Sequence, residues 1–455
     1  MARERLKSRL GFILLSAGCA IGIGNVWKFP YMAGQYGGGA FVLIYLFFLV
    51  IMGIPVMTME FSMGRAGQKS PVRLYQQLEP KGSKWHIHGY AAMAGNVILM
   101  MFYTTVAGWM LRYFVATATG KFQGLSPDGV EQSFGEMLSN PVEMIIFMGI
   151  IVVVGFLVCS LGLQNGLERV TKFMMVALLF VMIALAVNSI FMPGGQEGLA
   201  FYLKPDFNKM KEIGIVNVIF GAMSQAFFTL SLGIGAMAIF GSYIDKERSL
   251  LGESLNIALL DTFVAISSGL IIFPACFAYN VEVDSGPSLI FITLPNIFNN
   301  MPLGRVWGSL FFIFMTFAAL STVLAVFENI MSCTIDLFGW SRKKASVIDG
   351  ILMFVLSLPC ALGFNVLSGI QPLGKGTSIM DLEDFLVSNI LLPLGSLIFI
   401  IFCVSKRGWG WNNFVTEANA GKGLKIKNWM KGYMTYILPV IVAVILVVGM
   451  INYFR

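Results

Sequence analysis

The sequence predicts an all-α polytopic membrane protein, and three observations carry that prediction. Of its 455 residues, 57% are hydrophobic and only 12% are charged, whereas a soluble globular chain is about 25% charged. Its apolar runs are long enough to cross a hydrocarbon core of roughly 30 Å as helices, and they do not alternate as membrane strands would. Glycine pairs interrupt two of these runs, at Gly22-Ile23-Gly24 and Gly233-Ile234-Gly235.

The apolar runs divide the chain into eleven expected spans. They lie near residues 11–34, 40–63, 88–118, 142–160, 168–192, 215–241, 254–279, 306–335, 346–363, 386–404 and 433–453. We expect one integral-membrane domain over residues 1–455. Residues 1–192 and 214–404 would be its two five-helix repeats, because each half carries a glycine pair in its first run, and 433–453 would be an added helix.

Basic residues set the expected orientation. Most of the 31 Lys and Arg residues fall in the N-terminal segment and in alternate loops, and such loops usually stay in the cytoplasm. We therefore expect a multi-pass protein of the inner (plasma) membrane, with a cytoplasmic N terminus and an outer C terminus. The net charge of +7 follows from this topology and indicates no nucleic-acid partner. The six cysteines fall in apolar runs and are expected to be packing residues.

The two glycine pairs are the most informative motifs. Glycine removes the steric barrier to unwinding a helix. Oxygen-bearing side chains stand beside each pair, Asn25 in the first and Thr229 and Ser231 in the second. Unwound backbone within a membrane is tolerated only where it lines a cavity enclosed by protein. Two such breaks in matching segments predict a transporter built from inverted repeats.

Ionisable residues deep in expected spans are costly and usually functional. Four stand out: Lys28, Glu60, Asp261 and Glu328. Asp261 either coordinates a cation, which we favour, or is protonated and hydrogen-bonded to a neighbouring helix. Glu60 and Glu328 either cap unwound backbone or contact a ligand.

A stripe of small and hydroxyl residues occupies one face of the run 306–335. Its members stand at helical spacing: Ala318, Ser321, Thr322, Ala325 and Asn329. Such a stripe usually serves close helix packing, but hydroxyl oxygens are also ligands that hard cations such as sodium accept. Together with the two breaks and Asp261, the stripe would supply two compact oxygen cages.

Several segments match the motifs of one family. They occupy residues 9–11, 22–30, 37–41, 53–55, 60–65, 225–233, 291–295 and 388–395. In this order they resemble the neurotransmitter:sodium symporter family, specifically its bacterial amino-acid transporters with the LeuT fold. The resemblance covers the first ten runs. It implies a 5+5 inverted repeat with broken helices 1 and 6 and eleven transmembrane helices.

The resemblance implies two sodium sites. In the first, the ligands would be the Ala20 carbonyl, the side chains of Asn25, Thr229 and Asp261, and the carboxylate of the substrate. In the second, they would be the carbonyls of Gly18, Ile21 and Ala318 and the hydroxyls of Ser321 and Thr322.

The resemblance also implies where an amino acid would bind. Its carboxylate would accept hydrogen bonds from amides near Gly22 and Gly24 and from the Tyr103 hydroxyl, with help from the helix-end dipole. Its amine would face the backbone carbonyls of Ala20, Phe228 and Ser231. The pocket would be formed by Cys19, Ile23, Leu99, Tyr103, Phe228, Ile234, Phe317, Thr322 and Val326.

Two gates are implied as well. At the outer side, Phe228 would act as a lid with Tyr103. Lys28 would form an ion pair there with Asp384, for which Asp381 is the alternative partner. At the inner side, the gate would be formed by Arg3, Tyr243 and Asp336.

The chain departs from the family pattern at several of these positions. Lys28 stands where Arg is usual, so bidentate pairing is lost. Ile234 replaces an aromatic residue and Cys19 replaces Asn, and both changes alter the shape of the pocket. At the inner gate Leu6 replaces Trp, and in helix 5 Val176 replaces a Pro.

Asp261 is itself a departure, because Asn is usual there. The chloride-site pattern of animal relatives is only partly present, in Tyr45, Gln225 and Thr229, while Ala265 lacks the final hydroxyl. We hypothesise that the charge of Asp261 offsets the sodium ions in place of chloride in a low-dielectric site. Two sodium ions are therefore the expected cofactors, and chloride is not expected.

Sodium-coupled uptake of a neutral amino acid by alternating access is the predicted function. No bond is made or broken, and no nucleophile–base pair or metal-ligand cluster points to an enzyme. Tyr103, Phe228 and Phe317 could stack on a large apolar or aromatic side chain, and tyrosine is a candidate. The amino acid and the lipid bilayer are the expected partners, with no obligatory protein partner.

Two alternatives stay open. One is a proton-coupled amino-acid transporter of the same fold, in which Asp261 or Glu328 titrates instead of serving sodium. The other is an ion channel or sensor that retains the scaffold, which the two glycine pairs and the hydroxyl stripe disfavour.

Overall fold

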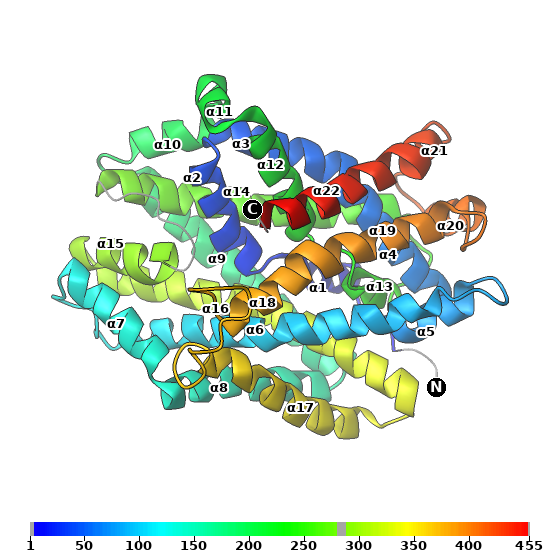
Figure 1. Ribbon diagram of the computed structural model, residues 1–455, viewed down its shortest axis with the longest axis horizontal. Helices are drawn as coiled ribbons and strands as arrows, with labels where there is room; N and C mark the ends of the chain where they lie inside the picture. Colours follow the sequence, from blue (N-terminus) through cyan, green and yellow to red (C-terminus); the bar gives the residue numbers. More distant parts are fainter. Residues whose placement is uncertain (1–3, 280–287, 454–455) are drawn as a thin grey trace.

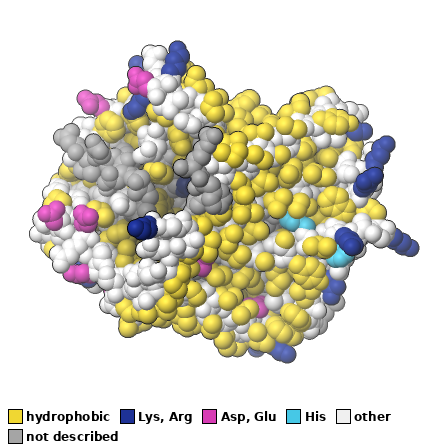
Figure 2. All heavy atoms as spheres, in the orientation of Figure 1, with side chains coloured by type: hydrophobic (Ala, Val, Ile, Leu, Met, Phe, Trp, Pro, Cys, Tyr) yellow, Lys and Arg dark blue, Asp and Glu magenta, His cyan; other side chains and the backbone are white. Residues whose placement is uncertain are grey.

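The computed structural model of this protein describes residues 4–279 and 288–453. Every regular element in these two stretches is a helix, as predicted. Most of the long helices run between the left and right ends of the molecule in Figure 1. Hydrophobic side chains cover much of the surface between those ends on the face shown in Figure 2. Apolar surface of this extent is typical of a membrane-embedded chain.

Nine spans are continuous in the part of the chain that the structure describes. They are α3–α4 (Gly39–Gly67), α6 (His86–Ala118), α8 (Pro141–Ser160), η3–α9 (Leu163–Ile190), α14 (Leu250–Ala278), α16 (Gly304–Phe338), α17 (Arg342–Leu362), α18–α19 (Ile379–Val404) and the C-terminal span (Met430–Ile451). The last of these is built from α21 (Met430–Gly432), η6 (Tyr433–Ile437) and α22 (Leu438–Tyr453).

Two further spans are broken. The first consists of α1 (Arg9–Ala20), then η1 (Gly24–Lys28) with α2 (Phe29–Gln35), and its halves are bent by 57°. The second consists of α12 (Ile215–Phe228) and α13 (Ala236–Gly241), separated by non-helical residues 229–235. Because α12 alone is too short to cross a bilayer, the pair counts as one span. The eleven predicted spans are therefore accounted for.

Several helices begin where their sequence supplies a start signal. The Ser8 hydroxyl accepts a hydrogen bond from the Gly11 amide at the start of α1. Ser378 and Asp381 form a capping box at the start of α18 (Ile379–Phe385). Such caps satisfy amides that have no partner inside the helix. Proline opens α5 (Pro71–Leu78), α7 (Pro127–Ser139) and α8, where its missing N–H costs nothing.

Short helices gather at the two ends of the molecule. At the left of Figure 1 lie α7, α10 (Gln196–Leu203), α11 (Phe207–Ile213) and α15 (Leu294–Asn300). At the right lie α5, α20 (Trp411–Ala418) and the N-terminal segment. On the face shown in Figure 2, Lys and Arg side chains gather mainly at the right-hand end and Asp and Glu side chains mainly at the left.

The core positions the first break against two long helices. α16 packs along α6 and also contacts α8 and α9. α1 contacts both α14 and α16, so the break that follows Ala20 meets side chains from those two helices. All six cysteines are buried and free, in agreement with the expected packing role.

Candidate functional site

The break in the first span exposes backbone at residues 21–24. α1 ends at Ala20, and Ile21 is extended, with φ −70° and ψ 100°. A β-carbon at Gly22 would collide with the hydroxyls of Tyr103 and Thr322. Glycine is therefore required here because α6 and α16 approach the unwound backbone closely.

The break in the sixth span has a different geometry. Ser231, Gly233 and Gly235 have φ values of 50°, 100° and 73°, so the chain takes a left-handed path that no α-helix can follow. The Ser231 hydroxyl lies 3.4 Å from the Cys19 carbonyl and joins the two breaks. The Glu60 carboxylate accepts a hydrogen bond of 2.6 Å from the Gly233 amide. Of its two predicted roles, Glu60 thus caps unwound backbone.

A first cluster of oxygen atoms joins the two breaks to α14. Asp261 accepts hydrogen bonds from the Asn25 amide group at 2.7 Å and from the Thr229 hydroxyl at 3.0 Å. The Asn25 amide group also lies 3.0 Å from the Thr229 hydroxyl. All three side chains are at most 1% exposed. They are the side chains predicted for the first sodium site, and Ala20, whose carbonyl completes the predicted set, ends α1 beside them.

A second cluster lies between α1 and α16. The Thr322 hydroxyl is 3.2 Å from the Gly18 carbonyl and 3.3 Å from the Ile21 carbonyl. The Ser321 hydroxyl is 2.9 Å from the Ala318 carbonyl and 3.4 Å from that of Ile21. The structure thus brings together all five residues predicted for the second sodium site. Neutral oxygen atoms at this density are a donor set that a hard monovalent cation fits.

Tyr103 of α6 and Phe228 at the end of α12 both contact the first break. The Tyr103 hydroxyl accepts a hydrogen bond of 3.0 Å from the Ile23 amide, at the place predicted for a substrate carboxylate. The Phe228 ring lies so close to Gly24 that a β-carbon there would be 2.9 Å from it. The Lys28 ammonium lies 3.8 Å from the centre of the same ring. At that distance a cation is attracted to the face of an aromatic ring.

A cavity of about 280 Å³ lies next to these residues, and we call it the outer cavity because the sequence predicts that this side faces outward. It is lined by Ile23, Gly24, Trp27, Lys28, Tyr31, Phe102, Tyr103, Val106, Phe228, Met380, Asp381 and Asp384. Sequence reasoning missed Trp27, Tyr31, Phe102, Val106 and Met380. Helical spacing could have found three of them, because Tyr31 follows Lys28 by three residues, Val106 follows Tyr103 by three and Trp27 follows Ile23 by four.

Other residues predicted for the pocket do not line this cavity. They are Cys19, Ala20, Gly22, Leu99, Ser231, Ile234, Phe317, Thr322 and Val326. Ile234 lines a separate cavity of about 280 Å³ with Gly233, Leu391 and Gly395. Its side chain packs against Gly95 and its carbonyl accepts a hydrogen bond from Asn96. The positive φ values of Gly233 and Gly235 on either side of Ile234 turn its side chain toward Gly95.

The predicted outer ion pair is not formed in this structure. Among the described residues, no ion pair joins Lys28 to either candidate carboxylate. Asp384 accepts a hydrogen bond of 2.7 Å from the Ser388 hydroxyl, and Asp381 caps α18. Both carboxylates are therefore satisfied locally, and Lys28 lies over Phe228 instead.

At the end of the molecule that is predicted to face the cytoplasm, called the inner side, the described residues add further contacts to the predicted gate residues Tyr243 and Asp336. Arg3 lies outside the described residues. Asp336 accepts a hydrogen bond of 2.7 Å from the Ser70 amide. The Tyr243 hydroxyl donates to Glu328 at 2.6 Å, and Arg342 pairs with the same carboxylate at 2.8 Å. Glu328 is thus held by a tyrosine and an arginine, and sequence reasoning missed Arg342 because a residue at the start of a span gives no periodic signal.

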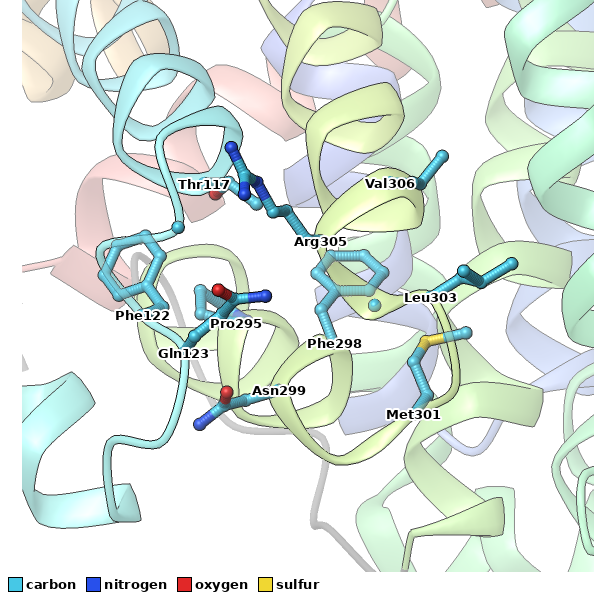
Figure 3. A pocket seen from close by; sticks show the side chains of 12 residues that line it. Thr117, Phe122, Gln123, Pro295, Phe298, Asn299, Met301, Leu303, Arg305 and Val306 are labelled. Atoms are coloured by element: carbon cyan, nitrogen blue, oxygen red, sulfur yellow. The ribbon is translucent and has the colours of Figure 1, made fainter.

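A larger cavity of about 370 Å³ lies between the ends of α6, α15 and α16. Figure 3 shows its lining, with Phe298 and Met301 on one side and Phe122 and Gln123 on the other. The Arg305 guanidinium at its edge donates hydrogen bonds to the Ala118 carbonyl. It contains no residue predicted for substrate or sodium, so it is separate from the candidate site.

A family model described as the sodium:neurotransmitter symporter family matches residues 3–125 and 130–455. The uncharacterized sodium-dependent transporter YhdH of Bacillus subtilis is 36% identical over 395 residues, which are 87% of this chain and 86% of that protein. An uncharacterized sodium-dependent transporter of Haemophilus influenzae is 30% identical over 462 residues, or 98% of both chains. The crystal structure of MhsT in complex with L-phenylalanine matches with a TM-score of 0.87 at 36% identity, over 98% of this chain and 100% of that one.

Proposed function

Because the chain belongs to the sodium:neurotransmitter symporter family, we propose that it couples uptake of a neutral, apolar or aromatic amino acid to the inward movement of two sodium ions. The family and the LeuT fold expected from the sequence are both confirmed. Substrate class, ion number, chloride independence and orientation in the membrane belong to the proposal.

One observation carries the proposal. The oxygen-rich clusters at Asp261 and at Thr322 flank the same unwound segment of the first span. One cluster contains a carboxylate, and the other contains only hydroxyl and carbonyl oxygens. Sodium can replace hydrogen bonds of each cluster with contacts to the oxygen atoms of Asp261, Thr229, Ser321 and Thr322. Asn25 donates through its Nδ2 here and its Oδ1 accepts from the Gly22 amide, so its side chain would have to turn its oxygen toward the ion. An ion bound at either cluster would fix the position of α1 relative to η1 and α2, the two halves of the first span.

The outer cavity supports the choice of substrate. The Tyr103 hydroxyl and the Ile23 amide lie where a carboxylate would be held. Aromatic side chains, among them Trp27, Phe102 and Phe228, form much of the wall. MhsT, the structural neighbour, was crystallised with L-phenylalanine. A zwitterion with an apolar side chain fits this combination of a polar floor and an aromatic wall.

Alternating access would proceed by closing the outer cavity and opening the inner side. Phe228 covers the break, and Lys28 lies on its ring, so both would move when substrate enters. Opening the inner side would separate Tyr243 and Arg342 from Glu328. Each sodium ion that moves down the membrane potential supplies about 2.3 kcal/mol per 100 mV, which drives the cycle.

The test is uptake by proteoliposomes in which sodium, potassium and proton gradients are set independently. Labelled phenylalanine, tyrosine and leucine should accumulate only with an inward sodium gradient, and a panel of twenty competing amino acids should rank apolar and aromatic ones first. Preference for glycine or alanine would contradict the substrate class. Accumulation driven by a pH gradient without sodium would instead support the proton-coupled alternative.

A further inference from the structure

One cavity lies apart from the proposed substrate site. It occupies about 370 Å³ between the ends of α6, α15 and α16, and we call it the α15 cavity (Figure 3). It shares no lining residue with the outer cavity, so a molecule bound in one cavity would leave the other free. Ligand pockets in proteins occupy about 300–1,000 Å³. The α15 cavity is therefore large enough for a molecule of the size of an amino acid.

The walls of the α15 cavity are held in place by packing and hydrogen bonds. The Phe298 ring of α15 lies 5.6 Å from the Phe311 ring of α16. Asn299 ties the loop after α6 to α15, because its amide group donates to the Leu125 carbonyl at 2.8 Å and its oxygen accepts from the Gly124 amide at 3.1 Å. The cavity is thus formed before any ligand arrives, and a preformed site loses less entropy on binding.

Arg305 is the only charged side chain among the twelve residues that line the α15 cavity, all of which the structure describes. Its Nε and Nη2 atoms donate hydrogen bonds to the Ala118 carbonyl at the end of α6. Its third nitrogen, Nη1, extends toward Gly120 of the lining. A guanidinium has five N–H groups, so some of them stay available to a ligand. No carboxylate of the described residues pairs with Arg305, and its charge is therefore not compensated there.

Two further features of the lining favour a negatively charged group. α16 begins at Gly304, and its N-cap residue Leu303 supplies no side-chain hydrogen bond. The first amides of a helix carry partial positive charge. Thr117 is 6% exposed, and its hydroxyl has no hydrogen-bond partner among the described residues, while its methyl group lies toward Gly308. A threonine hydroxyl can donate to an anion. The polar part of the lining therefore suits an anion and repels a cation.

The apolar part of the lining indicates what that anion carries. Phe122, Pro295, Phe298 and Met301 present apolar side chains to the α15 cavity. A bare inorganic anion would leave this surface uncovered, and a purely apolar molecule would leave the guanidinium of Arg305 unused. A carboxylate attached to an apolar body serves both parts, since guanidinium and carboxylate form charge-assisted hydrogen bonds and apolar surface gains free energy when it is buried.

We propose that the α15 cavity is a binding site for a small organic carboxylate with an aromatic or branched apolar body. The carboxylate pairs with Arg305 at the rim, and the apolar body packs against Phe122 and Phe298. No lining residue belongs to either oxygen cluster, so binding here needs no sodium. The site is additional to the proposed substrate site and goes beyond the proposed function.

Phenylacetate is the probe that tests this site. The full-length protein in detergent is placed in potassium medium, in which the sodium-dependent substrate site stays empty. Ligand-observed NMR then measures the dissociation constant, with protein-free micelles subtracted. We expect a value on the order of 1 mM for a probe of this size. The neutral analogue phenylacetamide should bind at least tenfold more weakly, and inorganic phosphate at equal concentration should not displace phenylacetate.

Two substitutions change the charge of the site in different ways. Arg305→Gln removes the positive charge and should weaken phenylacetate binding at least tenfold. Lys121→Gln removes the charge of an exposed neighbour outside the lining and should leave binding unchanged.

Leu303→Asp keeps Arg305, and with it the hydrogen bonds to α6, but adds a negative charge at the rim. It should also weaken binding at least tenfold, and the neutral variant Leu303→Asn is its matched control. Leu303 is 73% exposed and has a φ of 56°, a conformation that Asp and Asn tolerate, so both variants should fold.

Each outcome supports or overturns the inference. Phenylacetate binding that survives both Arg305→Gln and Leu303→Asp, equal affinity for phenylacetamide, displacement by phosphate, or no binding at ten times the expected constant overturns it. Because these measurements contain no sodium, such results leave the proposed function standing. Uptake of labelled L-phenylalanine that is indifferent to the exchange of sodium for potassium overturns the proposed function instead, and leaves binding in the α15 cavity unaffected.

Discussion

At the scale of single residues, Asp261 holds the first oxygen cluster together. It accepts hydrogen bonds from Asn25 and Thr229, and it brings a carboxylate to a place where both of those neighbours are neutral. Two sodium ions beside it would leave an excess of positive charge in a site that water does not reach. The carboxylate offsets part of that excess, which is the role proposed above in place of chloride.

Replacing Asp261 by Asn tests that role. The amide keeps the shape and removes the charge, so we expect the half-saturating sodium concentration to rise at least tenfold, or about 1.4 kcal/mol. Added chloride should restore part of the loss, whereas gluconate should not. Sodium-dependent binding of labelled phenylalanine measures both effects, with the exposed variant Glu131→Gln as control. An unchanged sodium requirement in chloride-free medium would contradict the assignment.

Thr322 allows a matched pair of variants at the second cluster. Thr322→Val removes the hydroxyl that lies among the carbonyls of Gly18, Cys19 and Ile21 and keeps the side-chain shape. We expect it to weaken sodium binding roughly tenfold, about 1.4 kcal/mol. Thr322→Ser keeps the hydroxyl and should lie near the wild type. If Thr322→Val and Thr322→Ser lost the same sodium affinity, side-chain packing and not the hydroxyl oxygen would determine binding at this cluster.

At the scale of elements, the break in the sixth span depends on a backbone path that glycine permits. Gly233 has a φ of 100° and lies against the Leu392 carbonyl of α19 (Leu392–Val404), where a β-carbon would collide with it. The unwound segment is thus packed against another helix and not loose. This close approach, together with the hydrogen bond from Gly233 to Glu60, fixes where α13 begins.

Gly233→Ala should therefore lower thermal stability. Strain at the left-handed φ and the collision with Leu392 should cost on the order of 1–3 kcal/mol. The control is Gly135→Ala on α7, where an added β-carbon meets open space and should be neutral or stabilise by about 0.5–1 kcal/mol. Unfolding midpoints in detergent compare the two variants. A midpoint of Gly233→Ala equal to that of the wild type would show that the backbone there adapts without strain.

The inner end is tied together by one buried arginine of α4 (Ile54–Gly67). Arg65 pairs with Glu417 of α20 at 2.7 Å and donates to the Arg248 carbonyl at 2.7 Å. Lys246 binds the same carboxylate at 2.8 Å. Because removing one member of a buried ion pair leaves the other uncompensated, these contacts hold α4, α20 and the loop before α14 as one unit.

At the scale of the whole molecule, the distribution of charge predicts orientation. The end that carries α5 and α20 is rich in Lys and Arg (Figure 2) and should face the cytoplasm. Single-cysteine labelling checks this, because the six native cysteines are buried and should react little. In intact cells, a membrane-impermeant maleimide should label Gly135→Cys, and it should label Lys343→Cys only after permeabilisation. The reverse pattern would place the N terminus outside.

The fold and the grouping of the oxygen-bearing residues into two clusters could be predicted from the sequence, because they depend on helical periodicity and on where the backbone is broken. Apolar runs gave the spans, glycine pairs gave the breaks, and i, i+3 and i+4 spacing placed Ser321 and Thr322 on one face. Side-chain direction was not accessible in the same way. Lys28 lies over Phe228 because Ser388 and the capping of α18 already satisfy the two acidic residues. Ile234 turns toward Gly95 because of a left-handed path that residue type alone does not specify.

Residues 18–25 of the first span serve both oxygen clusters, with Gly18 and Ile21 at one and Asn25 at the other. The two ions would therefore bind to the same backbone segment. The first ion to bind would order that segment and so raise the affinity for the second ion. Occupancy should rise as a sigmoid with sodium concentration instead of a hyperbola. At low external sodium concentration the transport rate would then be very low, and a modest rise in sodium concentration would increase it steeply.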